Sequence, residues 1–286
     1  MRKLYTEFKS LLKNIAIEEN VDLLIFRPLA FGLVKIIHRF PVTPNQLSLS
    51  SIAFGIMSGI MFSFGTKQSF IYAGILYGLT RVLDCSDGMI ARLKKNGTPV
   101  GRIVDGVVDY INAIAVFVGM GIGLSKSGLS LPVNPWILLI IAGGCMAVHA
   151  MVNDFYKNEF EAYALGKKKS NADDKKIFAD ELNKLRQNKV KPIDQFLIKI
   201  YLKYLNIQGS KSPQKFNYDQ KRYYQVNRVL MRFWTTIATS TYILMIMISA
   251  FLFDPKMFFY FSIIAANIWM LIFWRVQVFF NKKNRS

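Results

Sequence analysis

The sequence predicts an all-α polytopic membrane protein with six transmembrane helices and an N-terminal amphipathic helix that lies on the membrane surface. Three observations lead to this prediction. Of the 286 residues, 52% are hydrophobic, and they are gathered in long runs with few charges. The charged residues lie between these runs, and the formal net charge is +19. This distribution excludes a soluble globular domain and a disordered chain, because neither concentrates apolar residues in uncharged segments of membrane-spanning length.

Residues 1–45 form the first unit, an amphipathic juxtamembrane segment. Apolar residues recur in it at helical spacing, which predicts one helix or a pair of helices. The first 20 residues are charged and contain no apolar core, so no cleaved signal peptide is expected. Thr43 is the expected N-cap of the first membrane helix, with Pro44 in its first turn. The apolar positions are Leu11, Leu12, Ile15, Ile17, Phe26, Leu29, Leu33, Ile36 and Ile37.

Six segments carry the roughly 20 mostly apolar residues that a transmembrane helix needs. Four contain no Asp, Glu, Lys or Arg, namely residues 47–64, 127–153, 233–253 and 257–274. Residues 69–93 and 101–124 are also apolar but are interrupted by charged side chains. Residues 46–154 therefore hold four helices, and residues 155–232 form a basic cytoplasmic insertion. Residues 233–286 hold the last two helices and a cytoplasmic tail.

The basic residues alternate from one connection to the next. All but four of the 37 Lys and Arg residues lie before the first span, between the second and third, between the fourth and fifth, or after the sixth. The other three connections hold one each, Lys67, Lys126 and Lys256, and Arg81 lies inside a span. Because cytoplasmic connections are enriched in Lys and Arg, both termini are expected in the cytoplasm. In a bacterium the membrane would be the inner one.

The only acidic residues between positions 23 and 153 are four aspartates in the second and third spans. One pair is spaced i, i+3 and the other i, i+4, so each pair lies on one helical face. A short connection makes the two helices antiparallel neighbours, and the pairs can converge near the cytoplasmic side. Ionised carboxylates are costly there, and four hard oxygen donors suit one or two divalent cations, Mg²⁺ or Mn²⁺. The residues are Asp84, Asp87, Asp105 and Asp109.

The residues around the first pair indicate a phosphorylated substrate. Mg²⁺ usually binds few protein carboxylates together with phosphate oxygens. Gly88 and Ala91 leave room for a ligand beside the helix, and Arg92 is suited to bidentate phosphate contact. The combination predicts a site for a diphosphate whose apolar tail lies in the lipid. Arg81, one turn before Asp84, is either a structural counter-ion for the aspartates or a substrate contact.

Written out, the stretch is Asp84-Cys85-Ser86-Asp87-Gly88-Met89-Ile90-Ala91-Arg92, followed by Gly101, Asp105 and Asp109. It resembles the signature of the CDP-alcohol phosphotransferase family, DxxDGxxAR(x8)GxxxDxxxD, at every fixed position. The step from Thr43 to Leu47 resembles the same family, and the resemblance covers roughly residues 24–154.

The resemblance implies a six-helix enzyme of phospholipid biosynthesis. Such an enzyme transfers a substituted phosphoryl group from a CDP-linked alcohol to a second alcohol and releases CMP. The resemblance further implies that the four aspartates hold two divalent ions, with Asp109 as the general base. Gly88, Ala91 and Arg92 would contact the cytidine diphosphate, and Asn45 is a further candidate for the nucleotide site. The family often forms homodimers, so a second copy is an implied partner.

The implied donor is CDP-diacylglycerol, and two classes of acceptor remain open. The lead-in from Arg27 to Asn45 resembles inositol-lipid synthases, and we favour an inositol-type acceptor. The run Tyr110-Ile111-Asn112 instead resembles the choline and ethanolamine branch, whose acceptor is diacylglycerol or another lipid alcohol. Members that use a phosphorylated acceptor often carry a basic residue where Tyr110 stands, which argues against such an acceptor here.

Other functions explain fewer of these residues. A cation transporter would account for the aspartates but not for Gly88, Ala91, Arg92 and Gly101 at their spacings. A non-catalytic lipid-binding scaffold would tolerate a broken motif, and no motif position is lost. The basic run at residues 167–169 lies beside the membrane and favours anionic lipid over nucleic acid as a partner. The two cysteines form no CxxC pair, so neither a disulfide framework nor a zinc site is expected.

Overall fold

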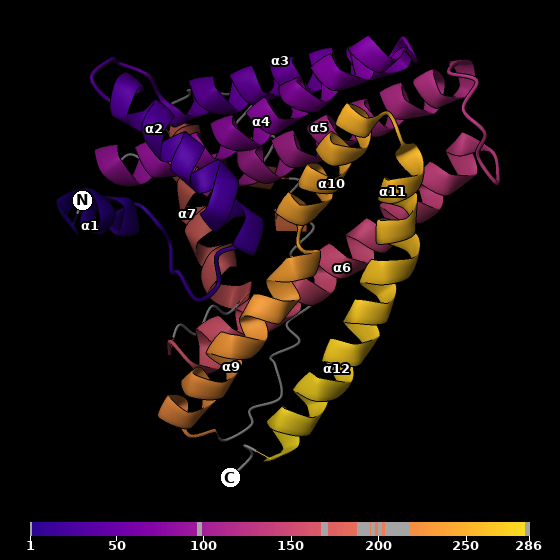
Figure 1. Ribbon diagram of the computed structural model, residues 1–286. Coiled ribbons are helices and arrows are strands. Elements are labelled where there is room, and N and C mark those ends of the chain that lie inside the picture. The colour runs from indigo at the N-terminus through magenta and orange to yellow at the C-terminus, as the bar shows by residue number, and fades with distance from the viewer. Residues whose placement is uncertain are drawn as a thin grey trace.

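The computed structural model describes residues 2–95, 99–166, 171–187, 195, 198–199, 202–203 and 218–283. Within these ranges the regular elements are helices (Figure 1). The predicted connection at 96–98, the basic run at 167–169 and part of the insertion lie outside them. The elements are α1 (Arg2–Ser10), η1 (Asp22–Phe26), α2 (Arg27–Ile37), α3 (Pro44–Ser63), α4 (Lys67–Lys94), α5 (Pro99–Lys126), α6 (Pro135–Tyr163), α7 (Asn171–Gln187), α9 (Gln220–Trp234), η2 (Thr235–Ile237), α10 (Thr239–Leu252), α11 (Pro255–Phe259), η3 (Tyr260–Ala265) and α12 (Ala266–Lys283).

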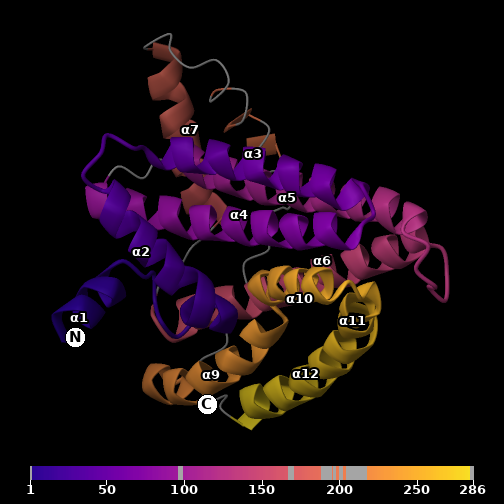
Figure 2. The same ribbon diagram turned by 45° about the horizontal axis from the view of Figure 1, so that its top comes forward.

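Helices α3, α4 and α5 lie side by side (Figures 1 and 2). The hydroxyl of Ser58 on α3 donates to the carbonyl of Ala73, near the start of α4, while Ser48 lies opposite the far end of α4, so this pair is antiparallel. Contacts between α3 and α5 follow the same direction in both helices, since Asn112 binds Ser51 and Lys126 binds the carbonyl of Ser63. Helix α4 therefore runs back from the end of α3 to the start of α5.

Glycines allow the backbones of α3 and α5 to touch. A methyl group at Gly119 would overlap the carbonyl of Gly59, and one at Gly59 would overlap the carbonyl of Ala115. Gly55 likewise faces Asn112 of α5. The Gly55–Gly59 pair thus packs inside the bundle, where small residues permit close helix approach.

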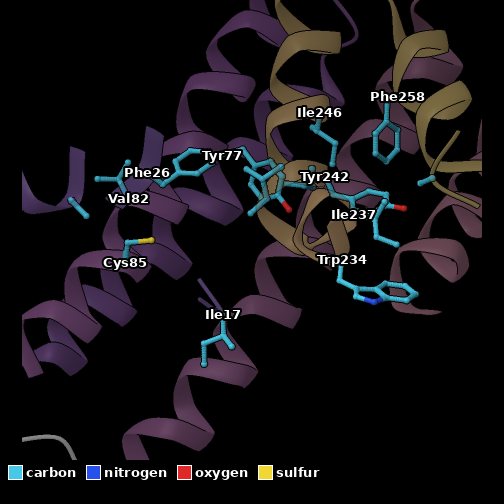
Figure 3. Packing of buried hydrophobic residues seen from close by; sticks show 14 of the residues in the cluster. Ile17, Phe26, Tyr77, Val82, Cys85, Trp234, Ile237, Tyr242, Ile246 and Phe258 are labelled. Carbon is cyan, nitrogen blue, oxygen red and sulfur yellow. The ribbon is translucent and has the colours of Figure 1, made fainter. Parts of the chain in front are cut away.

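The C-terminal helices cover the other side of α4. Helix α10 runs antiparallel to α4, with Phe253 packed edge-on against Phe70 at 5.2 Å between ring centroids. Helix α6 meets α10 where the ring of His149 hydrogen-bonds the hydroxyl of Tyr242, and His149 is fully buried. Figure 3 shows residues of α4, α9, α10 and α11 meeting in one apolar core that includes Tyr77, Trp234 and Phe258.

Among the residues that the structure describes, five helical stretches are long and apolar enough to cross a membrane, which makes this an integral membrane protein. They are Pro44–Ser63, Ile103–Lys126, Pro135–Tyr163, Gln220–Leu252 and Pro255–Lys283. Helix α4 has 28 residues, but its second half carries the charged motif. The helix at the fourth predicted span, residues 127–153, begins and ends later than predicted. It starts at Pro135, after a cap by Asn134 on the Trp136 amide, and continues to Tyr163.

The N-terminal segment consists of short helices joined by turns. Helix α2 buries Ala30, Phe31 and Val34 against the bundle. Thr43 caps α3 as predicted, because its hydroxyl accepts from the Gln46 amide and the Gln46 side chain accepts from the Thr43 amide. This reciprocal arrangement satisfies two backbone donors at the start of the first membrane helix.

Candidate metal centre and substrate site

Three of the four motif aspartates meet between α4 and α5. Asp84, Asp87 and Asp105 each place one carboxylate oxygen within 4.8 Å of the other two. Asp87 is buried, and the other two are half-buried. Asp109 lies one turn further along α5, outside this group, with an exposed side chain. The antiparallel course of α4 and α5 brings the first three together, as the sequence predicts, and leaves the fourth beside them.

The aspartates have polar partners on α3 and α4. The hydroxyl of Ser48 donates to Asp87 Oδ2 at 2.6 Å. Arg81 Nη1 donates to Asp84 Oδ2 at 2.7 Å. Both partners orient carboxylate oxygens by donating hydrogen bonds. Ser48 is neutral and Arg81 carries one positive charge, so together they neutralise at most one of the aspartate charges.

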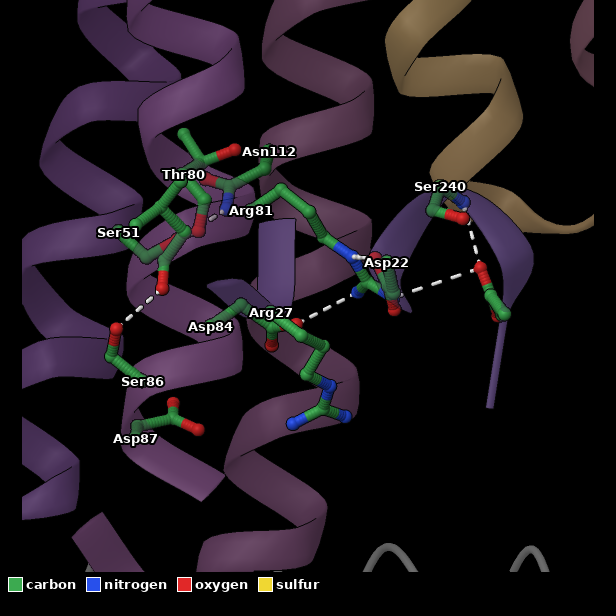
Figure 4. A network of polar contacts seen from close by, with 12 residues as sticks. Asp22, Arg27, Ser51, Thr80, Arg81, Asp84, Ser86, Asp87, Asn112 and Ser240 are labelled. Carbon is green, nitrogen blue, oxygen red and sulfur yellow. Dashed lines mark hydrogen bonds and ion pairs between the residues drawn. The ribbon is translucent and has the colours of Figure 1, made fainter. Parts of the chain in front are cut away.

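Arg81 joins the motif to the N-terminal segment (Figure 4). Its Nε and Nη2 atoms donate to the two carboxylate oxygens of Asp22 at 3.1 and 2.7 Å, while Nη1 binds Asp84. Glu19 lies 3.7 Å from Nη2. All three guanidinium nitrogens are engaged by carboxylates, so Arg81 is a structural counter-ion.

Sequence reasoning missed the acidic residues of the N-terminal segment. Glu19 accepts from the Ser240 amide at 2.8 Å and from Lys157 Nζ at 3.0 Å. Burial by itself raises the pKa of Glu19, but Lys157, Arg81 and the Ser240 amide outweigh it and lower the pKa to about 2. The available signal was the i, i+3 spacing of Glu19 and Asp22, which places both carboxylates on one helical face.

The charges around the aspartates do not balance. Five carboxylates lie here, those of the aspartate group and those of Glu19 and Asp22. Among the described residues, their ion pairs come from Arg81 and Lys157. Two ionised carboxylate oxygens within 4.8 Å of each other repel by at least about 3 kcal/mol at an effective dielectric constant of about 20. Three hard oxygen donors at this spacing could hold a divalent cation, which would relieve that repulsion.

The predicted nucleotide contacts lie at the same end of the bundle. Gly88 is covered by the guanidinium of Arg92, since a Cβ atom at Gly88 would lie 3.4 Å from Nη2. Arg92 Nε donates to the Leu11 carbonyl at 2.5 Å, whereas its buried Nη2 has no hydrogen-bond partner within the described ranges. Ala91 is half-buried, and Asn45 is exposed in the first turn of α3, one turn before Ser48. A buried guanidinium nitrogen left unpaired next to Gly88 of the motif fits a phosphate ligand.

The helix bundle, the group of three aspartates and the adjacent Arg92 together define a membrane protein with a candidate metal centre. A family model described as CDP-alcohol phosphatidyltransferase matches residues 41–202, more than half of the chain. The chain belongs to the CDP-alcohol phosphatidyltransferase family. The matched region contains all four motif aspartates and Arg92.

Two curated relatives match shorter stretches. The phosphatidylinositol phosphate synthase of Corynebacterium glutamicum is 34% identical over 85 residues, which is 30% of this chain and 38% of that protein. The bifunctional IPC transferase and DIPP synthase of Thermococcus kodakarensis is 38% identical over 68 residues, which is 24% of this chain and 15% of that protein. The matched stretch thus spans well under half the length of either relative.

Proposed function

We propose that this protein is an integral-membrane transferase of phospholipid biosynthesis. It moves a substituted phosphoryl group from a CDP-linked alcohol to a second alcohol and releases CMP. The observation that carries the proposal is the convergence of Asp84, Asp87 and Asp105 on two adjacent helices, in a chain whose family model is named for this transfer.

The donor in this proposal is CDP-diacylglycerol, and the acceptor is of the inositol type. The Corynebacterium glutamicum relative, named for phosphatidylinositol phosphate, supports this choice. An acceptor such as diacylglycerol is the second candidate. Tyr110 favours it, because this aromatic side chain is 75% exposed directly after Asp109 and offers apolar surface to a lipid.

The proposed cofactor is a pair of divalent ions, Mg²⁺ or Mn²⁺. Asp84, Asp87 and Asp105 would hold them, and Asp109 would complete the set. The all-oxygen donors and the uncompensated negative charge fit hard cations of this kind. When bound, the ions supply electrostatic stabilisation of the diphosphate and of the departing CMP.

In the proposed reaction the acceptor hydroxyl attacks the phosphorus farther from cytidine. The bond between that phosphorus and the bridging oxygen breaks, and CMP leaves with the electron pair. Asp109 takes the hydroxyl proton, a role open to it because its side chain is exposed beside the aspartate group. Arg92, through its unpaired Nη2, holds the diphosphate together with Gly88 and Ala91, and Asn45 contacts the nucleotide.

We further propose six transmembrane helices, with both termini and the aspartates on the cytoplasmic side. The parallel course of α3 and α5 supports this, because α4 must then cross between them. The N-terminal segment lies on the membrane surface in this proposal. Helix α2 supports that location, since Leu29 and Ile36 are 57% and 67% exposed on the face opposite its buried residues. A homodimer, as the family implies, completes the proposal, with membrane lipids as the surrounding partners.

The test measures CMP release by purified protein with CDP-diacylglycerol, Mg²⁺ and a panel of inositol, inositol phosphate, glycerol phosphate, serine and diacylglycerol. Asp109→Asn should lower CMP release at least about 100-fold, the contribution typical of a positioned general base. Asp180→Asn, which removes an exposed carboxylate from α7, is the matched control. The absence of CMP release with every acceptor would refute the proposed activity. Full CMP release by Asp109→Asn would refute the role of Asp109 as the base.

A further inference from the structure

A cavity of about 730 Å³ lies between the N-terminal segment and α9. Its lining contains none of the motif aspartates and none of the proposed nucleotide contacts. Its polar side chains include four basic residues and no acidic one: Lys9, Lys13, Asn14, Tyr224, Arg228 and Arg232.

Within the described residues, no direct ion pair neutralises the basic side chains of this cavity. Arg232 is oriented by neutral acceptors, because its guanidinium donates to the carbonyls of Ile15 and Glu18. The Glu18 carboxylate is buried and engaged elsewhere, with Arg27 at 3.0 Å and the Lys13 amide at 3.1 Å. Four like charges around one cavity favour an anionic ligand.

The position of the cavity relative to the membrane indicates the region from which it would bind that ligand. The candidate span Gln220–Leu252 is interrupted, because a 3-10 turn at Thr235–Ile237 and the extended Ala238 separate α9 from α10. The uncharged run begins at Phe233, and charged residues are costly in the hydrocarbon core, so α9 is expected outside that core. Tyr224 and Arg228 lie in α9, which places them at the level of the phospholipid headgroups. Basic residues at this level attract anionic headgroups.

We propose that this cavity binds a negatively charged phosphate group, outside the catalytic site and independently of the proposed transfer reaction. Arg228 and the lysines supply the charge, and the guanidinium geometry suits phosphate oxygens. The phosphate can be carried by an anionic membrane phospholipid or by a small soluble molecule, and the experiment separates these sources.

The experiment compares the full-length protein with the triple variant Lys9→Ala, Lys13→Ala, Arg228→Ala. Arg232 is kept because it holds the N-terminal segment. The control triple variant, Lys221→Ala, Arg222→Ala, Lys282→Ala, removes the same charge from exposed positions outside the cavity. Native mass spectrometry of detergent-purified protein measures retention of phosphatidylglycerol and of zwitterionic phosphatidylcholine. A competition arm adds inorganic phosphate.

The wild type and the control should retain phosphatidylglycerol in preference to phosphatidylcholine, and the cavity variant should bind phosphatidylglycerol about tenfold more weakly or worse. Displacement of bound phosphatidylglycerol by millimolar phosphate indicates that the cavity recognises the phosphate group from either source. Phosphatidylglycerol that stays bound despite phosphate indicates the lipid source, and phosphate binding without lipid retention indicates the soluble source.

Equal binding of phosphatidylglycerol by wild type and cavity variant, or an equal loss of binding in the control variant, overturns the proposal. Unchanged melting temperatures show that the variants remain folded.

Discussion

Arg81 shows at the scale of one residue how the site is connected to the rest of the molecule. It binds Asp22, which belongs to the N-terminal segment, and Asp84, which belongs to the motif helix α4. Its side chain is only 11% exposed. A guanidinium buried among carboxylates offsets part of their negative charge, so its loss leaves those buried charges without a counter-ion.

Replacing Arg81 should therefore destabilise the protein. Arg81→Met leaves buried carboxylates without their counter-ion and should cost roughly 3–5 kcal/mol. Arg81→Lys should cost less, because it keeps the charge but loses the bidentate contact with Asp22. Thermal unfolding in detergent measures both. Arg222→Met, at an exposed position of α9, is the control, and an unchanged melting temperature in Arg81→Met would show that the network contributes nothing.

Glu19 should make stability depend on pH in a defined window. Its pKa falls from 4.5 to about 2 on folding, so the folded state favours the ionised form. The stabilisation is fully present above pH 4.5 and is lost as the pH falls toward 2. The difference in melting temperature between wild type and Glu19→Gln should be constant above pH 5 and should shrink below pH 4.5. A difference that grows on acidification would contradict the assigned direction.

At the scale of elements, the contact between α3 and α5 depends on the absence of side chains. Gly119 faces the Gly59 carbonyl too closely for a methyl group. This contact fixes the distance between the first and third membrane helices. Since α4 packs beside both, the contact also positions the aspartates that α4 and α5 share.

Gly119→Ala should destabilise the bundle by about 1–3 kcal/mol, the usual range for overpacking. Gly144→Ala is the control, because a methyl group there meets nothing within 4 Å and alanine has the higher helix propensity. Melting temperatures in detergent should fall for the first variant and hold or rise for the second. Equal behaviour of the two would mean that α3 and α5 can separate without cost.

Packing of helix α7 of the insertion should hold the first turns of α5 in position. Phe178 and Leu182 are buried against Ile103 and Val104, directly before Asp105, in a cluster separate from the main core. Phe178→Ala should therefore raise the Mg²⁺ concentration needed for half-maximal CMP release several-fold, because supporting contacts set the position of a site residue. The melting temperature should fall as well, because truncating a buried Phe costs about 3–5 kcal/mol, so the Mg²⁺ requirement is measured well below the unfolding range. Ile177→Ala, at a 45% exposed position, should behave as wild type, and a normal Mg²⁺ requirement in Phe178→Ala would exclude this role.

At the scale of the whole molecule, the order of the helices predicts which residues share a side of the membrane. With native cysteines replaced, Lys9→Cys and Lys221→Cys should react with an impermeant thiol reagent from the same side. Lys126→Cys, at the far end of α5, should react only from the opposite side. Labelling of Lys9→Cys and Lys126→Cys from one side would mean that α4 does not cross between α3 and α5, and the six-helix topology would be wrong.

The sequence by itself determined the membrane class, most of the helices, the Thr43 cap and the aspartate pairs on adjacent helices. These features depend on spacing and charge within short stretches, which local patterns record. Only the tertiary structure decided that Asp22 and Glu19 join the network of Arg81, that Asp109 stands beside the group of three, and that Arg232 holds the N-terminal segment. The contacts of Arg81 with Asp22 and of Arg232 with Asn20 span 59 and 212 residues. No local period specifies such pairs, because they exist only after separate helices have packed together.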